Sequence, residues 1–464
     1  MPLPMKSVTS PITNHYESLA LTNNPFPSDP IIRPRSTDRR TNGAIFADGC
    51  RKEVISRFEK LLLRGADFEN RARMALLWSE GDKETGRGTG KTALLRHFQH
   101  RINRDWGATE FKQFNAAVIY VCFPDQVDRL FSEQLAWAAL LDAEESGLIR
   151  AASAMLRLTE IQKHWPKEGD ALLEEIKRAG VDGRDSVDVL FDDQVLEATG
   201  LVVQEVLSAV VEHLTDAGVK DAVAEALAAA DLTGHLRSFR RDGEVRPYYV
   251  QRETKGLTHA KEVLFNDIVR FLIEAGFAGA YLFIDDIENL TDQMANKETI
   301  EFAKELALCL VRPGRASGET RFFTGVVTTH QQAATKLARG WGEAGLQGVA
   351  RMDATADTSV KVPLPSEDGA LEMLAEYIKE HRLPGKDGLE RLHPFTEAAA
   401  RKLVSGVSPA LHPRTFLQKA HFAVRQAADD GLKSIELVNI EKLFANLGVE
   451  ATASTGEPET FDTY

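Results

Sequence analysis

The chain has 464 residues, of which 43% are hydrophobic and 27% charged, an ordinary composition for a globular protein. Its formal net charge is −13, from 56 Lys and Arg against 69 Asp and Glu, so the chain as a whole lacks the charge of a protein that coats nucleic acid. Domains commonly hold about 100–200 residues, so two or three structural units are expected.

Three cysteines, Cys50, Cys122 and Cys309, are too few and too scattered for a disulfide framework or a zinc cluster. Cys122 and Cys309 stand inside apolar runs and are interpreted as small core residues. The first residues lack the apolar stretch of a signal peptide, and no window approaches the roughly 18 consecutive apolar residues of a membrane span. A cytoplasmic protein without a membrane contact is therefore expected.

The N-terminal residues 1–45 are rich in Pro, Ser, Thr and Arg and predict an extended arm with one aromatic anchor, Phe26. A helix near 48–64 follows, because its apolar residues recur at helical spacing. Beyond it, five nearly continuous apolar segments predict buried strands, separated by helical patterns. The expected fold is therefore α/β, a parallel sheet sandwiched by helices. The predicted strands are 74–78, 116–123, 280–284, 322–328 and 359–364.

The stretch from about 125 to 270 is rich in Ala, Leu and Glu with helical periodicity, which predicts a helical insertion between the second and third strands. After Pro365 the pattern is helical again, at 368–381, 396–405, 414–430 and 438–447. The last residues are acidic and poor in apolar side chains, and are expected to be disordered. The predicted parts are an arm at 1–45, a core at 46–124 and 257–365, an insertion at 125–256, a C-terminal helical domain at 366–449 and a tail at 450–464.

The strongest motif is TGRGTGKT at residues 85–92, which follows the first strand and opens a helical pattern. Glycines let backbone N–H groups wrap phosphates closely, and the N-terminus of the helix attracts the same anion. In the pattern GxxxxGK[ST], Lys91 reaches the β- and γ-phosphates and Thr92 gives its hydroxyl to Mg²⁺. The first glycine of that pattern is displaced here, since Thr85 stands in its place, and a chance Gly-Lys-Thr turn is the alternative. The predicted nucleotide-binding residues of this loop are Gly86, Arg87, Gly88, Thr89, Gly90, Lys91, Thr92 and Ala93.

The third strand ends in two carboxylates, Asp285 and Asp286, which are costly at the end of a buried strand unless they bind something at the edge of the sheet. Asp285 is predicted to hold Mg²⁺ directly or through water. Asp286 or Glu288 is predicted to polarise the attacking water as general base. An acidic turn without a ligand is the alternative. Together the two motifs predict an Mg-ATP site.

These motifs resemble those of the AAA+ family, within its initiator-like group of origin-recognition ATPases and ATPases of secretion and transposition systems. The resemblance covers about 20–123 and 255–447 and implies a P-loop core followed by a helical lid domain. Asp286 stands where the family usually has Glu, which leaves fast hydrolysis open. The fourth strand resembles the sensor-1 strand, where Thr329 or His330 would replace the usual Asn, with a structural His as the alternative.

The resemblance also implies an arginine finger at Arg351, which would complete the site of a neighbouring subunit, with Arg339 as the fallback and a solvated Arg as the alternative. Arg414, after Pro413, stands where the group has its sensor-2 Arg, although Leu411 replaces a glycine of that pattern. Asn24 and Phe26 resemble the N-terminal segment that lies near the adenine in this group.

Two functions remain open at this point. In the first, the chain is an ATPase that forms a homo-oligomer and uses ATP to switch or remodel a partner in a bacterial system for phage defence, transposition or secretion, with the insertion contacting a protein partner. In the second, it is a static ATP-bound switch or scaffold. Segment 236–249 interleaves Arg237, Arg240 and Arg241 with aromatic residues. Nucleic-acid contact there is one reading, and a solvated hairpin or protein-contact loop is the other.

Overall fold

The structure is a computed structural model, and it describes residues 15–33, 36–63, 74–81, 88–112, 114–122, 131–232, 249–250, 260–261, 263–288, 294–311, 322–347, 351–353, 356–406 and 411–453. The chain forms two compact units, each assembled from segments that are distant in sequence. The sheet unit consists of Ser56–Gly86 and Phe98–Lys361. The helical unit consists of Met1–Ile55, Arg87–His97 and Val362–Tyr464.

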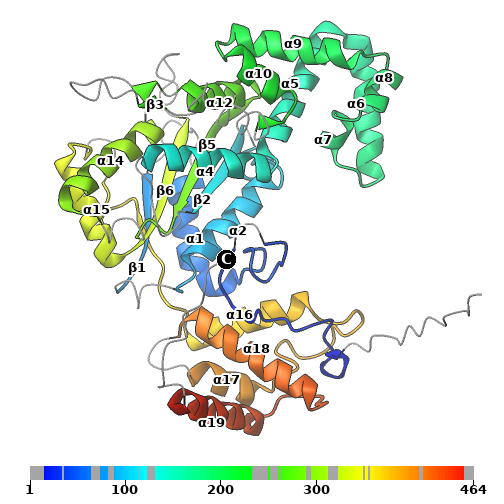
Figure 1. Ribbon diagram of the computed structural model, residues 1–464. Coiled ribbons are helices and arrows are strands. Elements are labelled where there is room, and N and C mark those ends of the chain that lie inside the picture. The colour runs from blue at the N-terminus through cyan, green and yellow to red at the C-terminus, as the bar shows by residue number, and fades with distance from the viewer. Residues whose placement is uncertain are drawn as a thin grey trace, which may run out of the picture. The chain divides into compact units, whose positions relative to one another are not determined.

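The sheet unit contains five parallel strands in the order β2-β5-β6-β1-β7 (Figure 1). The predicted α/β architecture and its five strands are therefore confirmed. The sequence placed some ends differently: β5 begins at Phe277, β6 runs to His330, and β7 stops at Lys361. The strands are β1 (Met74–Ser79), β2 (Asn115–Cys122), β5 (Phe277–Asp285), β6 (Phe323–His330) and β7 (Ser359–Lys361).

Helices cover both faces of this sheet, which is why its strands read as continuous apolar runs. On one face, Phe283 of β5 meets Phe58, whose ring stacks on Phe98 with centroids 4.4 Å apart. Leu282 and Ile284 alternate with Phe283 and lie in the core on the other face, with residues of α4, α12, α14 and α15. The helices are α1 (Lys52–Phe58), the π-helical turn η3 (Glu59–Leu63), α2 (Lys91–Asn103), α3 (Ala108–Phe111), α4 (Phe131–Glu145), α12 (Val263–Glu274), α14 (Asn296–Val311) and α15 (Gln331–Glu343).

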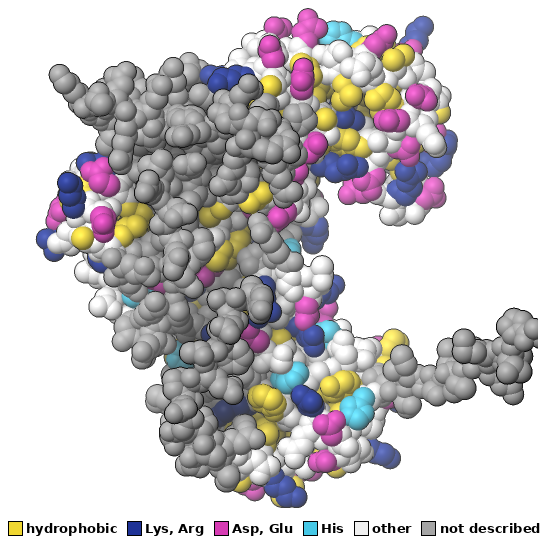
Figure 2. Space-filling model, in the orientation of Figure 1, with side chains coloured by type: hydrophobic (Ala, Val, Ile, Leu, Met, Phe, Trp, Pro, Cys, Tyr) yellow, Lys and Arg dark blue, Asp and Glu magenta, His cyan; other side chains and the backbone are white. Residues whose placement is uncertain are grey.

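Between β2 and β5 the described residues are almost entirely helical, as the Ala- and Leu-rich composition predicts. Asp185 and Asp192 cap the N-termini of α7 and α8 with their carboxylates, and Pro166 opens α6. On the face shown in Figure 2, acidic and basic side chains are interspersed over these helices. The helices are α5 (Leu148–His164), α6 (Pro166–Val181), α7 (Ser186–Val189), α8 (Asp193–Ala198), α9 (Val203–Asp216) and α10 (Asp221–Ala228).

Two short strands, β3 (Tyr249–Val250) and β4 (Ala260–Lys261), pair antiparallel after these helices, where the sequence predicts hardly any strand. Arg237, Arg240 and Arg241, proposed from the sequence as a partner surface, lie outside the described residues.

The helical unit is a group of helices on which the N-terminal arm packs. Ser366 and Thr396 cap α16 and α17 through their hydroxyls, as expected for helix N-termini. Its elements are the 3-10 turns η1 (Glu17–Leu19) and η2 (Gly49–Arg51) and the helices α16 (Glu367–Glu380), α17 (Glu397–Ser405), α18 (Pro413–Asp429) and α19 (Leu437–Ala453). The four predicted helices are confirmed, but α19 continues to Ala453, so residues 450–453 are helical rather than part of a disordered tail.

The sequence predicts that Cys122 and Cys309 are core residues. Cys122 is exposed at the carboxyl end of β2 and is not a core residue. The strand pattern misled because the apolar run ends where the strand leaves the core. The side chain of Cys309 lies outside the described residues. Among the described helices, none is both long and apolar enough to cross a membrane.

Candidate functional site

The glycine-rich turn in front of α2 has the backbone that a phosphate-binding loop needs. Gly88 and Gly90 have φ angles of 74° and 96°, a left-handed region that residues with a Cβ rarely adopt. The helix α2 begins at Lys91, and the N–H of Leu94 donates to the carbonyl of Gly90 at 3.0 Å. The first N–H groups of α2 have no intrahelical acceptors, so this end of the helix suits an anion. Gly86 and Arg87 lie outside the described residues.

Polar side chains are buried at this turn. Lys91 is 6% exposed and Thr89 is 3% exposed, while Thr92 and Ala93 are half-buried in the first turn of α2. The Thr89 hydroxyl oxygen is buried and has no hydrogen-bond partner among the described residues. A buried hydroxyl without a partner costs about 1–3 kcal/mol, which a bound polar ligand would relieve. The turn therefore fits a phosphate group in its backbone conformation, its charge and its unsatisfied polar atom.

The start of α18 lies beside the same turn, within the helical unit. A Cβ built on Gly88 would be 3.7 Å from Cβ of Arg414 and 3.8 Å from Nδ1 of His412. The Arg414 side chain is 53% exposed and lies 3.5 Å from Asp29. A half-exposed pair of this kind is worth little, so the guanidinium can turn to another anion at low cost. The structure thus brings Arg414 next to the glycine turn, as the resemblance implies.

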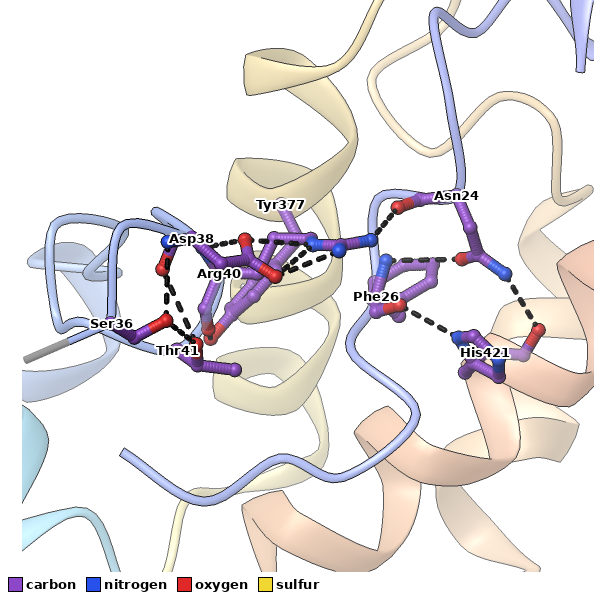
Figure 3. Close-up of polar contacts among 8 residues, drawn as sticks. All are labelled: Asn24, Phe26, Ser36, Asp38, Arg40, Thr41, Tyr377 and His421. Carbon is purple, nitrogen blue, oxygen red and sulfur yellow. Dashed lines mark hydrogen bonds and ion pairs between the residues drawn. The ribbon is translucent and has the colours of Figure 1, made fainter. Parts of the chain in front are cut away.

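Asn24 and Phe26 hold the N-terminal arm on the helices of the helical unit (Figure 3). Asn24 donates through Nδ2 to the carbonyl of His421 at 3.0 Å and accepts the N–H of Phe26 at 3.1 Å. The Phe26 ring is fully buried against Tyr377 and Phe395, with centroids 6.0 and 6.2 Å away. The side chains of both residues are therefore engaged in packing within this unit, and their contact with adenine stays a prediction.

In the sheet unit, Asp285 ends β5 and its carboxylate is fixed by two hydroxyl groups. Tyr120 of β2 donates to Oδ2 at 2.5 Å, and Thr328 of β6 donates to Oδ1. All three residues are buried, with exposures of 3% or less. Burial, followed by the charge of Asp285, raises the pKa of the Tyr120 hydroxyl well above its ordinary value, so this group stays a donor. Two hydroxyl donors, one on each oxygen, fix the plane of this buried carboxylate.

Asp286 follows in a strained backbone conformation, with a φ of 56°. Its N–H donates to Thr328 Oγ1 at 3.1 Å, and its Oδ2 lies 3.5 Å from the sulfur of Cys122. Positive φ at a non-glycine residue is sparsely populated and is found most often where a site demands it. Glu288, two residues further, is 1% exposed. Both candidates for a general base therefore lie within the turn that leaves β5.

The two sensor-1 candidates lie buried at the end of β6. Thr329 and His330 are fully buried, and the Thr329 hydroxyl donates to the carbonyl of His330 at 3.2 Å. The Nδ1 of His330 accepts the N–H of Ala333 at 3.2 Å and caps α15. Their role as sensor 1 stays a prediction. Thr328, one residue earlier, contacts the carboxylate of Asp285, and sequence reasoning missed this contact because three polar residues in succession do not indicate which one faces Asp285.

The two arginine-finger candidates lie on the surface. Arg351 is 64% exposed in its side chain and pairs with Asp353 at 3.3 Å. Arg339 is also 64% exposed and pairs with Glu343, four residues on along α15, at 2.8 Å. Exposed pairs such as these contribute about 0–1 kcal/mol, so either guanidinium can leave its carboxylate and bind a second chain at little cost in free energy.

The carboxylates lie at an edge of the sheet where parallel α/β folds bind ligands. The neighbouring strands β1 and β6 run parallel, and the helices that follow them lie on opposite faces. Phe98 of α2 packs on one face, whereas Leu337 and Trp341 of α15 belong to the core on the other. Ligands in such folds bind beyond the carboxyl ends of the strands where connections diverge in this way.

The donor set of Asp285 suits a hydrated magnesium ion rather than a metal cage. Among the described residues, no group of three or more His, Cys, Asp or Glu could hold a metal ion. Mg²⁺ commonly takes one or two protein oxygens together with waters and phosphate oxygens. Asp285 keeps lone pairs on both oxygens after accepting one hydroxyl on each. The residues present therefore fit Mg²⁺ bound with a nucleotide.

Tyr120 is the second residue that sequence reasoning missed. A Tyr near the end of a buried strand needs a partner for its hydroxyl, and this was the available signal. Its partner is 165 residues away in sequence, so only the strand order could identify it.

Comparisons of the chain with protein-family models, with curated proteins and with solved structures find no match.

Proposed function

We propose that this chain is an ATP-binding ATPase of the AAA+ type. The observation that carries the proposal is the turn at 88–90, where two glycines with positive φ precede Lys91 at the start of a 13-residue helix. The buried, unsatisfied hydroxyl of Thr89 supports it independently. A chance Gly-Lys-Thr turn on the surface would leave the lysine exposed, whereas Lys91 is 6% exposed.

In the proposed reaction, the chain's own groups bind and orient. Lys91 and the N–H groups at the start of α2 bind phosphate oxygens, and Arg414 adds a second cation. By the sequence motifs, Thr92 and Asp285 would each supply an oxygen to Mg²⁺, which would offset the charge of the phosphates when bound. Asp286 or Glu288 takes the proton of the attacking water.

The proposed working form is a homo-oligomer in which Arg351 of one subunit serves the site of the next. The exposure of Arg351 and its weak pair with Asp353 support this role. We propose that ATP binding and hydrolysis switch or remodel a partner, contacted through the helices between β2 and β5. A bacterial multi-component system for phage defence, transposition or secretion is proposed by analogy to the family alone.

The second candidate is a static, ATP-bound switch with little turnover. Asp286 favours it, because its shorter carboxylate lies 3.5 Å from the Cys122 sulfur and its backbone is strained. A single-turnover measurement with excess protein separates the candidates. Hydrolysis within minutes supports the motor, whereas bound ATP that stays intact for hours supports the switch.

The binding claim is tested by Lys91→Ala, with Lys52→Ala as the matched control. Lys52 is exposed at the start of α1, so its loss removes the same charge without touching the turn. We expect Lys91→Ala to abolish binding of a fluorescent ATP analogue and Lys52→Ala to bind like the wild type. Equal affinity in all three proteins would sink the proposal.

A further inference from the structure

A buried arginine that the sequence motifs do not include lies directly against the glycine turn. Arg51, at the end of η2, is 5% exposed. Its Nη2 donates to the carbonyl of Thr89, and its Nη1 donates to the carbonyl of Pro363. Both acceptors are uncharged main-chain groups, and burial lowers the pKa of this guanidinium. A buried cation with neutral acceptors is costly, and a nearby anion would offset that cost.

The contact with Thr89 fixes the direction of the next N–H group. A trans peptide is planar, so the carbonyl of Thr89 and the N–H of Gly90 point in opposite directions. Because Arg51 holds the carbonyl, that N–H points to the side of the loop away from the guanidinium. The charge of the Arg51 guanidinium also polarises the peptide between Thr89 and Gly90 and strengthens the Gly90 N–H as a hydrogen-bond donor.

Gly90 permits this close approach. A Cβ on Gly90 would lie 3.2 Å from Nη2 of Arg51, and its φ is 96°. A side chain at this position would therefore strain the turn and push the guanidinium away. The glycine before the lysine serves the contact with Arg51 as well as the loop conformation.

The segment that carries Arg51 is itself fastened to the first turns of α2. Nε of Arg96 donates to the carbonyl of Asn42 at 3.2 Å, and the Phe46 ring stacks on His97 with centroids 4.5 Å apart. These contacts hold residues 42–51 against the helix that begins at the turn. Arg51 is therefore held against the turn, so a change in the conformation of the turn moves its guanidinium directly.

The second acceptor lies in the connection between β7 and α16. Pro363 stands between Lys361, the last residue of β7, and Glu367, the first of α16. One rigid, planar guanidinium thus holds the phosphate turn and this connection together. We infer that Arg51 is a positioning residue that aligns the turn for a nucleoside triphosphate and transmits its binding to residues 362–366.

This inference rests on the proposed ATP binding, and the experiment separates the two. Hydrogen exchange of the full-length protein is followed in a peptide covering 360–370, with and without ATP, and the affinity for ATP is measured in parallel. In the wild type, we expect ATP to slow exchange at this connection. In Arg51→Met, we expect about 10- to 100-fold weaker ATP binding, as for loss of hydrogen bonds from a charged donor, and no protection of the peptide at saturating ATP.

Arg51→Lys guards against a folding defect, since it keeps the charge but cannot hold two carbonyls in one plane. We expect it to melt within a few degrees of the wild type, to bind ATP, and to lose the ATP-dependent protection. Arg57→Met, an exposed residue of α1, is the charge-matched control and should behave like the wild type. If the wild type and both Arg51 variants bind ATP and show identical protection of the peptide, this inference alone is overturned. The same holds if the wild type binds ATP and shows no protection of the peptide. Failure of the wild type to bind ATP overturns the proposed function and this inference with it.

Discussion

The hydroxyl of Tyr120 offers the sharpest test of how the carboxylate of Asp285 is prepared for a metal. Tyr120→Phe removes one oxygen from a fully buried hydrogen bond of 2.5 Å and leaves the ring in place. Asp285 then retains the hydroxyl of Thr328 on its other oxygen. The carboxylate loses half of its fixed donors and can rotate about the remaining one.

The expected magnitude follows from the charge on the acceptor. A hydrogen bond to a charged group contributes about 1.5–3 kcal/mol, which corresponds to roughly a 10- to 100-fold change in an equilibrium constant. Loss of a group that orients a metal ligand typically costs about 10- to 100-fold in metal affinity, so the two estimates agree. We therefore expect the apparent dissociation constant for Mg²⁺ to rise by one to two orders of magnitude.

The assay titrates Mg²⁺ against a fluorescent ATP analogue at fixed protein concentration. Tyr281→Phe is the matched control, because Tyr281 is also buried in the sheet and its hydroxyl donates to the carbonyl of Leu62 at 2.6 Å. It should lose stability without losing Mg²⁺ affinity. If both variants, or neither, change the Mg²⁺ midpoint, the hydroxyl of Tyr120 does not orient a magnesium ligand.

The remaining predictions concern assembly, hydrolysis and pH. Arg351→Ala should leave ATP binding intact and remove the rise of turnover with protein concentration; turnover per subunit that never depends on concentration would exclude a finger in trans. Asp286→Asn should block hydrolysis while binding persists, and retained turnover would move the general-base role to Glu288. Burial raises the pKa of Asp267 from 3.8 to about 6, so its charge opposes folding above pH 6 and this cost fades as the pH falls toward 4. Asp267→Asn should therefore raise the melting temperature at pH 7.5, because it removes a folding penalty of up to about 3 kcal/mol, the equivalent of two pKa units. The gain in melting temperature should shrink at pH 5, and an equal gain at both pH values would contradict this reasoning.

Local patterns predicted the parts of this fold that depend on local chemistry. The strands of the sheet are nearly continuous apolar runs because both faces are covered, and such runs are visible in a sequence. The start of α2 at Lys91 and the turn before it were equally visible, since glycines and a helical pattern follow one another. The strand ends were less accurate, as in β5, which begins at the buried Phe277 rather than at Ala280, because the exposed Ala278 and the glycine Gly279 interrupt the apolar run.

Long-range register could not be predicted in the same way. Tyr120, Asp285 and Thr328 converge because β5 pairs with β2 on one side and with β6 on the other. Nothing in the local pattern of any one strand states that pairing. For the same reason the contact of Thr328 with the carboxylate of Asp285 was not predicted.

The attachment of the arm to the helical unit has a consequence for the order in which the parts of the chain fold during synthesis. Asn24 bonds to His421, 397 residues later, and the buried Phe26 belongs to the same core as α18. Ribosomes add about 5–20 residues per second, so the arm waits on the order of 20–80 s for its binding surface. During that interval its apolar anchor has no native place to pack. The segment around Phe26 is thus synthesised well before the helix on which it packs, and nascent chains halted before residue 413 should leave it open to proteases.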